Sequence, residues 1–384
     1  VALPSCKGTT CRMIEALLLQ GGYRVGTTLS PHIWRFNERI RLHGHDAGDD
    51  EICAAFAAID EARGDVALTY FEFSALAALY CMAQAQVDVA ILEIGLGGRL
   101  DAFNAIDPDI AVITSIGLDH QAFLGDTREA IGAEKAGILR SGQHVVLGQN
   151  MPASVLQRCE ELSLKPRCWG TDFSSASDID QGTWQLSRQS QASLEIPLTA
   201  IAPHNIALAC EAVADMVELD LDLIAKCSAA YMPGRMDIRQ TKDRMWILDV
   251  CHNPDGVRFF LSELASRKLR PAYFVCALLA GKAHQRLYTC VTGVVGKNGP
   301  WICGDQFTLA DVGMMVIFDR LREGDWLDLL VHQRPVLVDY WMVLQQRPSY
   351  HSGCVSFAHP RVTEATLELA ALKQAGQWPS DIPR

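Results

Sequence analysis

Helical and strand-like patterns of apolar residues alternate along residues 1–150 of the chain. Apolar side chains recur at helical spacing over residues 9–20, and the pair Gly21-Gly22 ends that pattern. The same spacing predicts further helices over residues 50–63, 73–85 and 127–136. Short apolar runs predict strands over residues 23–28, 87–93, 111–116 and 144–148. Strands separated by helices are typical of a parallel sheet with helices on both faces, so we expect an α/β fold.

The pattern changes beyond residue 150. Residues 172–199 are rich in Ser and Gln with alternating apolar positions, which predicts a peripheral hairpin, and helical spacing returns over 204–219. After a polar stretch at 240–244, the run MWILDV predicts a strand, followed by a turn, a helix to about residue 265 and a strand over 272–280. We therefore expect a second α/β lobe and place a domain boundary near Lys242, with domains over 1–242 and 243–290.

The α/β alternation stops after residue 290. Residues 304–322 carry Thr308 and Asp311 at capping-box spacing before an apolar helix, and residues 334–346 predict a second helix. We therefore expect a helical segment over 291–355, followed by a tail over 356–384 with a strand and a helix.

Length and composition narrow the class of protein. A chain of 384 residues with 49% hydrophobic residues suits a folded protein of roughly two or three domains. The net charge of −11 argues against nonspecific binding to nucleic acid or anionic membranes, so positive charge for an anionic substrate must gather locally. No apolar run reaches membrane-spanning length, and no secretory signal is visible. The 13 cysteines follow no metal-binding spacing, which favours reduced thiols in a cytoplasmic protein. We expect a monomer that binds no nucleic acid and no membrane.

Three ionisable residues stand where chemistry is expected in such a sheet. Glu93 and His120 each follow an apolar run, and Lys135 lies inside a helical pattern. Ligands bind at the carboxyl ends of parallel strands, and carboxylate oxygens with one imidazole suit a magnesium-dependent phosphoryl-transfer site. Each of the three residues alone would more often be part of a salt bridge or a hydrogen-bonded core.

Lys7-Gly8-Thr9 lies between a strand fragment and a helix, which is the position of a phosphate-binding loop. Such loops carry glycines where this chain has Leu3 and Cys6, and a side chain forced into the left-handed conformation costs roughly 1–2 kcal/mol. The alternative is an ordinary strand-to-helix turn with an exposed lysine. Residues 30–40 could likewise be a solvated loop, and the aromatic side chains of residues 70–73 could belong to the core.

Taken together, the ordered motifs resemble one family. From Val1 to about Lys282 the chain resembles folylpolyglutamate synthase and its dihydrofolate synthase relatives, members of the Mur ligase superfamily. The resemblance is carried by SPHI (30–33), NERI (37–40), LEIGLGGRLDAFN (92–104), TSIGLDH (114–120), EKAGI (134–138) and DVCHNP (249–254). It implies a parallel-sheet P-loop-type ATPase domain followed by a truncated Rossmann-like lobe. It also implies a ligase that uses ATP and Mg²⁺ to add L-glutamate to folate or pteroate through an acyl phosphate.

The resemblance also implies roles for individual residues. The ATP phosphates would be held by Lys7, Gly8, Thr9 and Thr10. Mg²⁺ would be coordinated by Thr9, Ser30, Glu93 and His120. The nucleotide would also contact Asn205, Arg235, Asp249 and His252. Catalysis would involve Lys7, His120 and a carbamylated Lys135, and the folate end would be shaped by Phe71, Arg99 and Asp101.

The chain departs from the family pattern in several places. Besides Leu3 and Cys6, the turn at residues 280–283 lacks the acidic residues of the family's second domain. From about Gly299 the stretches FTLADV and RPSY resemble the helical half of a glutathione transferase, without a thioredoxin-like half before them. Two alternatives to a ligase follow. One is a ligase-derived protein that binds nucleotide or folate without turnover, and the other is a glutathione-transferase-like binding module.

Overall fold

The computed structural model describes residues 7–118, 120–178, 181–189, 192–199, 201–229, 233–241, 245–250, 254–269, 335–347 and 350. The chain divides into two compact units, Val1–Arg270 and Pro271–Arg384. None of the described helices is both long enough and apolar enough to cross a bilayer.

The first sheet follows helix α1 (Lys7–Gln20) and has the strand order β3-β2-β1-β4. Its strands are β1 (Val25–Thr28), β2 (Ile40–Leu42), β3 (His45–Asp46) and β4 (Val89–Ile91), with the short helix η1 (Phe36–Arg39) before β2. β1 runs parallel to β4 and antiparallel to β2. The sheet is therefore mixed, with its parallel pair on the side where the predicted ligand residues lie.

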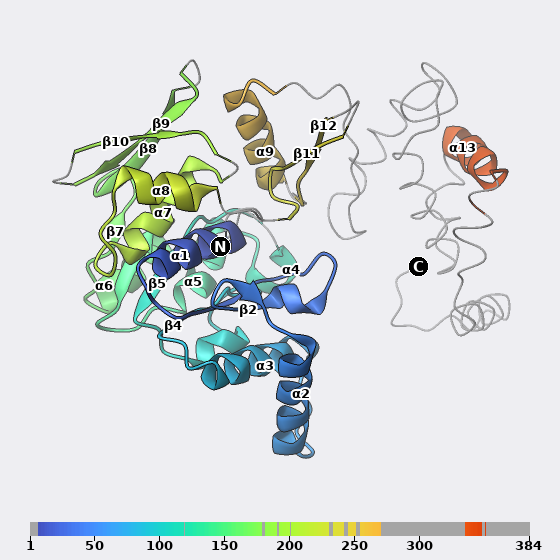
Figure 1. Cartoon of the computed structure of the whole chain (residues 1–384), viewed down its shortest axis with the longest axis horizontal. Helices are drawn as coiled ribbons and strands as arrows, with labels where there is room; N and C mark the ends of the chain where they lie inside the picture. The colour runs from blue at the N-terminus through green and yellow to red at the C-terminus, as the bar shows by residue number, and fades with distance from the viewer. Residues whose placement is uncertain are drawn as a thin grey trace. The chain divides into compact units, whose positions relative to one another are not determined.

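Helices α2 (Asp49–Arg63) and α3 (Tyr70–Gln84) pack together (Figure 1). Their buried apolar side chains form one cluster with those of β2. The start of α3 differs from the prediction, which placed it at residue 73. The cause is a capping box, in which the backbone N–H of Glu72 donates to Thr69 Oγ1 and that of Thr69 donates to the Glu72 carboxylate. The aromatic residues of 70–73 are therefore helical.

The second sheet is parallel and has the strand order β5-β6-β7. Its strands are β5 (Ile110–Ile113), β6 (His144–Leu147) and β7 (Arg167–Cys168). Its helices are α4 (Gln121–Leu124), α5 (Arg128–Ala136) and α6 (Ala153–Glu161), and the short helix η2 (Ala102–Ala105) precedes β5. Both β5–β6 and β6–β7 are parallel pairs. This arrangement confirms the α/β fold with parallel strands that the apolar pattern predicts.

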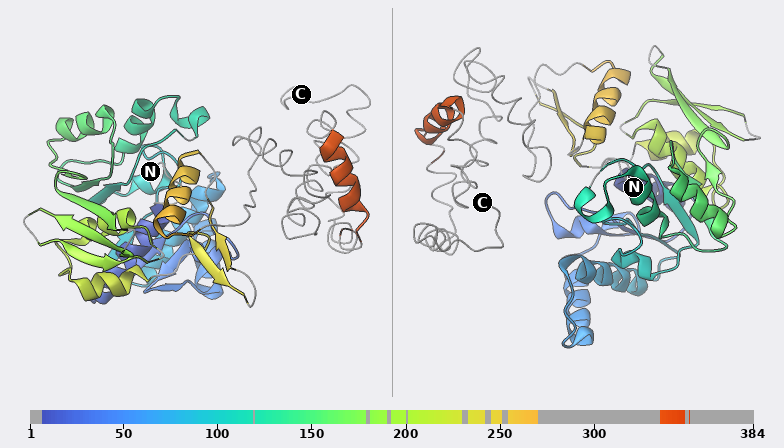
Figure 2. Two further views of the ribbon diagram at one scale, coloured as in Figure 1. Left: turned by 90° about the horizontal axis from the view of Figure 1, so that it is seen from above. Right: turned by 180° about the vertical axis from the view of Figure 1, so that it is seen from behind.

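A third sheet replaces the peripheral hairpin predicted over 172–199. Its antiparallel strands are β8 (Phe173–Asp178), β9 (Thr183–Arg188) and β10 (Leu194–Pro197). It lies beside helices α7 (Pro203–Val213) and α8 (Leu221–Ser228) in both views (Figures 1 and 2). Trp184, Leu186 and Ile196 are at most 1% exposed and belong to the same core as α1 and α7. The predicted hairpin is present as β8–β9, but a third strand extends it, and the sheet is not peripheral because its apolar face is buried.

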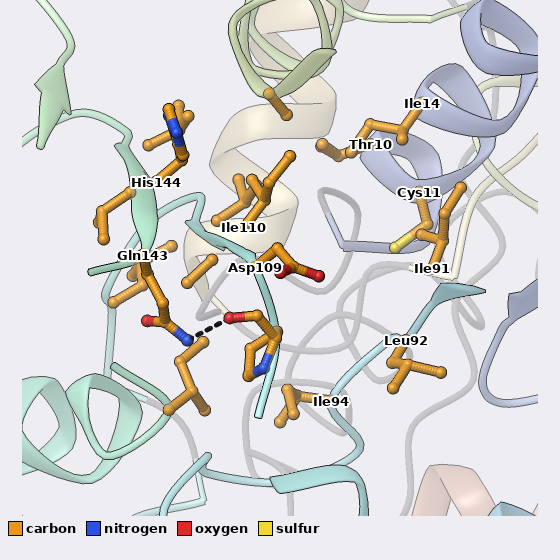
Figure 3. A pocket seen from close by; sticks show the side chains of 18 of the residues that line it. Thr10, Cys11, Ile14, Ile91, Leu92, Ile94, Asp109, Ile110, Gln143 and His144 are labelled. Atoms are coloured by element: carbon orange, nitrogen blue, oxygen red, sulfur yellow. Dashed lines mark hydrogen bonds between the residues drawn. The ribbon is translucent and has the colours of Figure 1, made fainter. Parts of the chain in front are cut away.

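A cavity of about 830 Å³ separates β4 from β5, the facing edge strands of the first two sheets. Apolar side chains of both strands and of α1 line it, among them Ile91, Ile110 and Ile14 (Figure 3). Within the described residues, no strand pairs with β4 and β5 across this space. α1 packs on β1 and β4, α7 packs on β5 and β6, and the two helices pack on each other. The helices therefore join the two sheets.

Strands β11 (Asp237–Gln240) and β12 (Met245–Leu248) form an antiparallel pair before helix α9 (Pro254–Ser266). The pair joins residues on both sides of the boundary predicted near Lys242, and the two compact units divide at Arg270–Pro271; the predicted domain boundaries stay a prediction. In the second unit, α13 (Pro335–Gln345) matches the helix predicted over 334–346. The strand predicted over 272–280 and the helix over 304–322 lie outside the described residues, as does most of the glutathione-transferase-like stretch.

Candidate functional site

Glu93 follows β4 and points its carboxylate into a buried polar environment. Its side chain is 4% exposed, and its Oε2 accepts a hydrogen bond from the backbone N–H of Ser30 at 2.7 Å. The backbone N–H of Glu93 donates to Thr28 Oγ1 at 2.9 Å. Burial raises the pKa of Glu93, although Lys7, the Ser30 N–H and Arg235 act in the opposite direction. A buried carboxylate with few charged neighbours is a position that a bound cation would stabilise.

Lys7 begins α1 and reaches over the end of β4. Its Nζ donates to the carbonyl oxygens of Ile94 at 2.6 Å and Gly95 at 3.0 Å. Lys7 and Glu93 line the same cavity. The N-terminus of a helix carries partial positive charge, so α1 and the ammonium together favour an anion at this place.

Buried hydroxyls without partners lie on the walls of this cavity. Thr10 and Thr114 are each 2% exposed and line it from α1 and from the end of β5. Within the described part of the chain, the Oγ1 atoms of both lack a hydrogen-bond partner, as do Ser115 Oγ and Asn205 Oδ1. Unpartnered buried polar atoms are uncommon in proteins. The cavity therefore fits a polar ligand at the carboxyl ends of the strands.

Lys135 lies on α5, is 5% exposed and also lines the cavity. Close packing of the glycine-rich turn fixes the end of this helix, because a Cβ on Gly98 would lie 3.0 Å from the Lys135 carbonyl oxygen. A Cβ on Gly137 would lie 2.4 Å from the Cβ of Arg99. The GLGGRLD and EKAGI motifs thus meet face to face, which explains their small residues.

The three residues predicted at the folate end have different surroundings. Asp101 Oδ2 accepts from the backbone N–H groups of Gly95 and Leu96 at 2.9 and 3.0 Å, so this carboxylate folds the turn that contains it. Arg99 pairs with Glu134 at 2.8 Å, while its side chain stays 56% exposed. Phe71 packs against Gly95 and meets Phe103 edge-on, with ring centroids 5.7 Å apart.

His120 precedes the short helix α4. It is an exposed residue at the start of α4, with a φ of 52°, and is not among the residues that line the cavity. Among the described residues, no group of three or more His, Cys, Asp or Glu side chains could hold a metal ion. Lys7, Thr10, Glu93 and Lys135 therefore line one cavity, with Ser30 bonded to Glu93, and His120 is not among the residues that line it.

The residues predicted to contact the nucleotide from later in the chain lie at two turns. Asn205 is buried in the first turn of α7. Arg235 acts on the pKa of Glu93, and the next residue, Met236, donates its backbone N–H to Asp249 Oδ2 at 3.0 Å. Asp249 thereby ties the end of β12 to the turn that carries Arg235. His252 lies outside the described residues.

The sequence analysis missed two groups of residues at this site. Thr28 Oγ1 accepts the backbone N–H of Glu93. His204 donates to the carbonyl of Thr114, and its ring centroid lies 4.5 Å from that of Trp169. Burial lowers the pKa of His204 to about 4, with the Thr114 carbonyl acting in the opposite direction. His204 stands between Pro203 and Asn205 at a helix start, which was the only signal in the sequence.

Comparison with known proteins identifies the family. The Mur ligase middle domain matches residues 6–214, more than half of the chain. Dihydrofolate synthase/folylpolyglutamate synthase of Escherichia coli (strain K12) is 41% identical over 268 residues, covering 69% of this chain and 63% of the relative. The protein of the same name from Haemophilus influenzae is 37% identical over 319 residues, covering 77% of this chain and 71% of the relative. The chain thus spans somewhat less than two thirds of the length of the E. coli relative.

A solved structure agrees with this similarity. A bifunctional folylpolyglutamate synthase/dihydrofolate synthase with Mn, AMPPNP and L-glutamate bound is 40% identical, with a TM-score of 0.62 over 67% of this chain and 63% of that one. The alignment of sequence and fold leads to one conclusion: the chain belongs to the dihydrofolate synthase/folylpolyglutamate synthase family, with its Mur ligase middle domain.

Proposed function

We propose that the protein is an ATP-dependent ligase that adds L-glutamate to folate or dihydropteroate. The observation that supports this most is Glu93, a buried carboxylate at a strand end beside Lys7 and unpartnered hydroxyls. The relatives are named for this activity, and one of them holds Mn, AMPPNP and L-glutamate. In the reaction, a folate carboxylate oxygen attacks the γ-phosphorus of ATP, and ADP leaves. The glutamate amine then attacks the acyl carbon, and phosphate leaves as the amide forms.

The residues at the end of β4 fit a magnesium ion. Mg²⁺ is usually held by one or two carboxylates together with substrate phosphates and water, so a single Glu93 is a suitable donor set. When bound, the ion would neutralise negative charge on the phosphates. We propose that Glu93 coordinates it, and that Ser30, Thr9 and His120 complete the metal site.

Lys7 and α1 are suited to hold the phosphates. An ammonium has three N–H donors, and two of those on Lys7 bond to the carbonyls of Ile94 and Gly95. We propose that the third donates to a phosphate oxygen, with the backbone of Gly8 and the hydroxyls of Thr9 and Thr10 around the same phosphates. Asn205, Arg235, Asp249 and His252 would complete the nucleotide site.

Lys135 and the glycine-rich turn would serve the other substrates. A buried ammonium beside magnesium would be repelled, so we propose that Lys135 is carbamylated and carries negative charge there. Phe71 would contact the folate ring. Because Asp101 and Arg99 are bonded within the turn and to Glu134, we propose that they shape the folate end from behind.

The test is phosphate release from ATP that requires both a folate and glutamate. Glu93→Gln should lower this rate by more than 100-fold, beyond the roughly 10–100-fold loss typical of groups behind a metal ligand. Glu61→Gln changes an exposed glutamate of α2 in the same way and should leave the rate unchanged. Turnover of ATP that ignores both substrates would refute the proposal.

A binding protein without turnover is the second candidate, because Leu3 and Cys6 replace phosphate-loop glycines in the sequence. Both residues lie outside the described part of the chain. Stabilisation by Mg-ATP separates the cases, since a ligand at 100 times its dissociation constant adds about 2.7 kcal/mol. Stabilisation without folate-dependent phosphate release would favour this candidate, and activity appearing only in the Leu3→Gly, Cys6→Gly double variant would support it further.

A further inference from the structure

The loop from Ser30 to Arg39 contacts both ends of the candidate site. Its first residue donates the backbone N–H that holds the Glu93 carboxylate at 2.7 Å. Its last residue, Arg39, faces the aromatic residue that begins α3, one position before Phe71. The loop therefore connects the proposed metal ligand with the first residue of α3, the helix that carries the proposed folate contact.

Glu38 closes the middle of this loop on itself. Its carboxylate accepts hydrogen bonds from the backbone N–H groups of Ile33, Trp34 and Arg35 at 2.7, 2.8 and 2.8 Å. Burial alone would raise the pKa of Glu38, but these three donors lower it below its usual value. These hydrogen bonds tie residues 33–35 to Glu38 in the middle of the loop.

Arg39 fixes the two ends of this loop. Its Nε donates to His32 Nδ1 at 2.7 Å, and its carbonyl accepts from the backbone N–H of Leu29 at 3.1 Å. Its guanidinium carbon lies 5.9 Å from the ring centroid of Phe36 and 5.4 Å from that of Tyr70. A guanidinium can donate through Nε and stack on rings at the same time, whereas an ammonium cannot reproduce this geometry.

We infer that Arg39 is a positioning residue, which sets Ser30 against Glu93 and couples that contact to the start of α3. This inference rests on the proposed function, because it takes Glu93 as the metal ligand. Groups behind a metal ligand typically change metal affinity by about 10–100-fold when altered. Arg39 bonds to Leu29 and His32 on either side of Ser30 and not to Ser30 itself, so the lower end of that range applies.

The test measures Mn²⁺ binding in the presence of ATP by water-proton relaxation, which does not require turnover. Arg39→Lys should weaken Mn²⁺ binding about tenfold. Arg63→Lys is the matched control, because Arg63 lines a small pocket together with Phe36 and Tyr70, the rings that Arg39 faces, but pairs with Asp60 on its own helix. The control should bind Mn²⁺ as the unaltered protein does.

Tyr70 offers an independent pair of variants should Arg39→Lys fail to fold. Tyr70→Phe keeps the ring under the guanidinium and should bind Mn²⁺ normally, whereas Tyr70→Leu removes the ring and should weaken binding. Equal Mn²⁺ affinity in Arg39→Lys or Tyr70→Leu and the unaltered protein would overturn the inference, as would an unaltered protein that binds no Mn²⁺. Loss of the proposed function alone has a different signature, namely normal Mn²⁺ binding with no folate-dependent phosphate release.

Discussion

The carboxyl ends of β4 and β5 face the same cavity but are built differently. At β4, the backbone and side chain of Glu93 both have partners, in Thr28 and Ser30, and Lys7 bonds to the next two residues. At β5, the hydroxyls of Thr114 and Ser115 lack partners within the described residues, and so does His204 Nε2. The first end is organised by the protein itself. The second holds buried polar atoms whose partner would be the ligand.

The largest expected effect is the loss of folding stability at acidic pH that His204 causes, because the ring Nε2 of His204 is buried beside the end of β5. Burial lowers the pKa of His204 from the usual 6.5 to about 4 in the folded protein, so the unfolded chain binds a proton first as the pH falls. The free energy of unfolding should therefore keep the full contribution of neutral His204 above pH 6.5. It should decrease by up to about 3 kcal/mol as the pH falls toward 4. His204→Gln should remove this decline, as measured by urea unfolding at pH 6.5 and 4.5. An unchanged decline would assign it to other groups.

A matched pair of threonines tests the contrast directly. Thr28→Val leaves the backbone N–H of Glu93 without its acceptor and should lower the free energy of unfolding by about 1–3 kcal/mol. Thr114→Val removes a hydroxyl that has no partner in the described residues, and should raise the stability of the ligand-free protein by up to about 1 kcal/mol.

Denaturant unfolding of the two valine variants gives both values, and thermal shifts with Mg-ATP show whether Thr114→Val loses part of the ligand's stabilisation. Equal destabilisation by both substitutions would mean that the two strand ends do not differ in the way described.

The smallest effect concerns the contact between the turn after β4 and the helix after β5. Arg99 and Glu134 form a partly exposed ion pair at 2.8 Å. A double-mutant cycle with Arg99→Gln and Glu134→Gln should give a coupling energy of about 0.2–1 kcal/mol in unfolding experiments. A larger folate KM in Arg99→Gln than in Glu134→Gln would instead indicate direct contact between Arg99 and the substrate.

Local patterns were sufficient for much of the fold. The periodicity of residues 9–20 and 127–136 predicted α1 and α5 to within two residues at each end, because one apolar face of each helix is buried. For residues 172–199 it predicted the hairpin but not the third strand or its burial, because a few large side chains such as Trp184 provide the buried face among polar neighbours. It also failed at Tyr70, where a capping box decides the start of the helix.

The sequence predicted which residues belong to the candidate site better than it predicted how those residues contact one another. Glu93 and Lys7 stand at the ends of recognisable patterns, and the structure brings them together. The bond between Ser30 and Glu93 joins residues 63 positions apart, and no local spacing encodes it. The position of His120 likewise depends on how α4 is placed, which the sequence motif does not specify.

The separation of β4 from β5 has a consequence for how the molecule opens. The helix pair α1 and α7 spans the seam in place of a ladder between β4 and β5. Opening of the two halves along these strands is therefore resisted by helix packing and by the few hydrogen bonds between the turn after β4 and α5, such as that from the Arg99 N–H to the Glu134 carbonyl. Amide deuterium uptake should therefore be faster along the facing edges than in β1 or β6. A ligand that contacts both β4 and β5 would hold the two halves together and slow deuterium uptake in both strands.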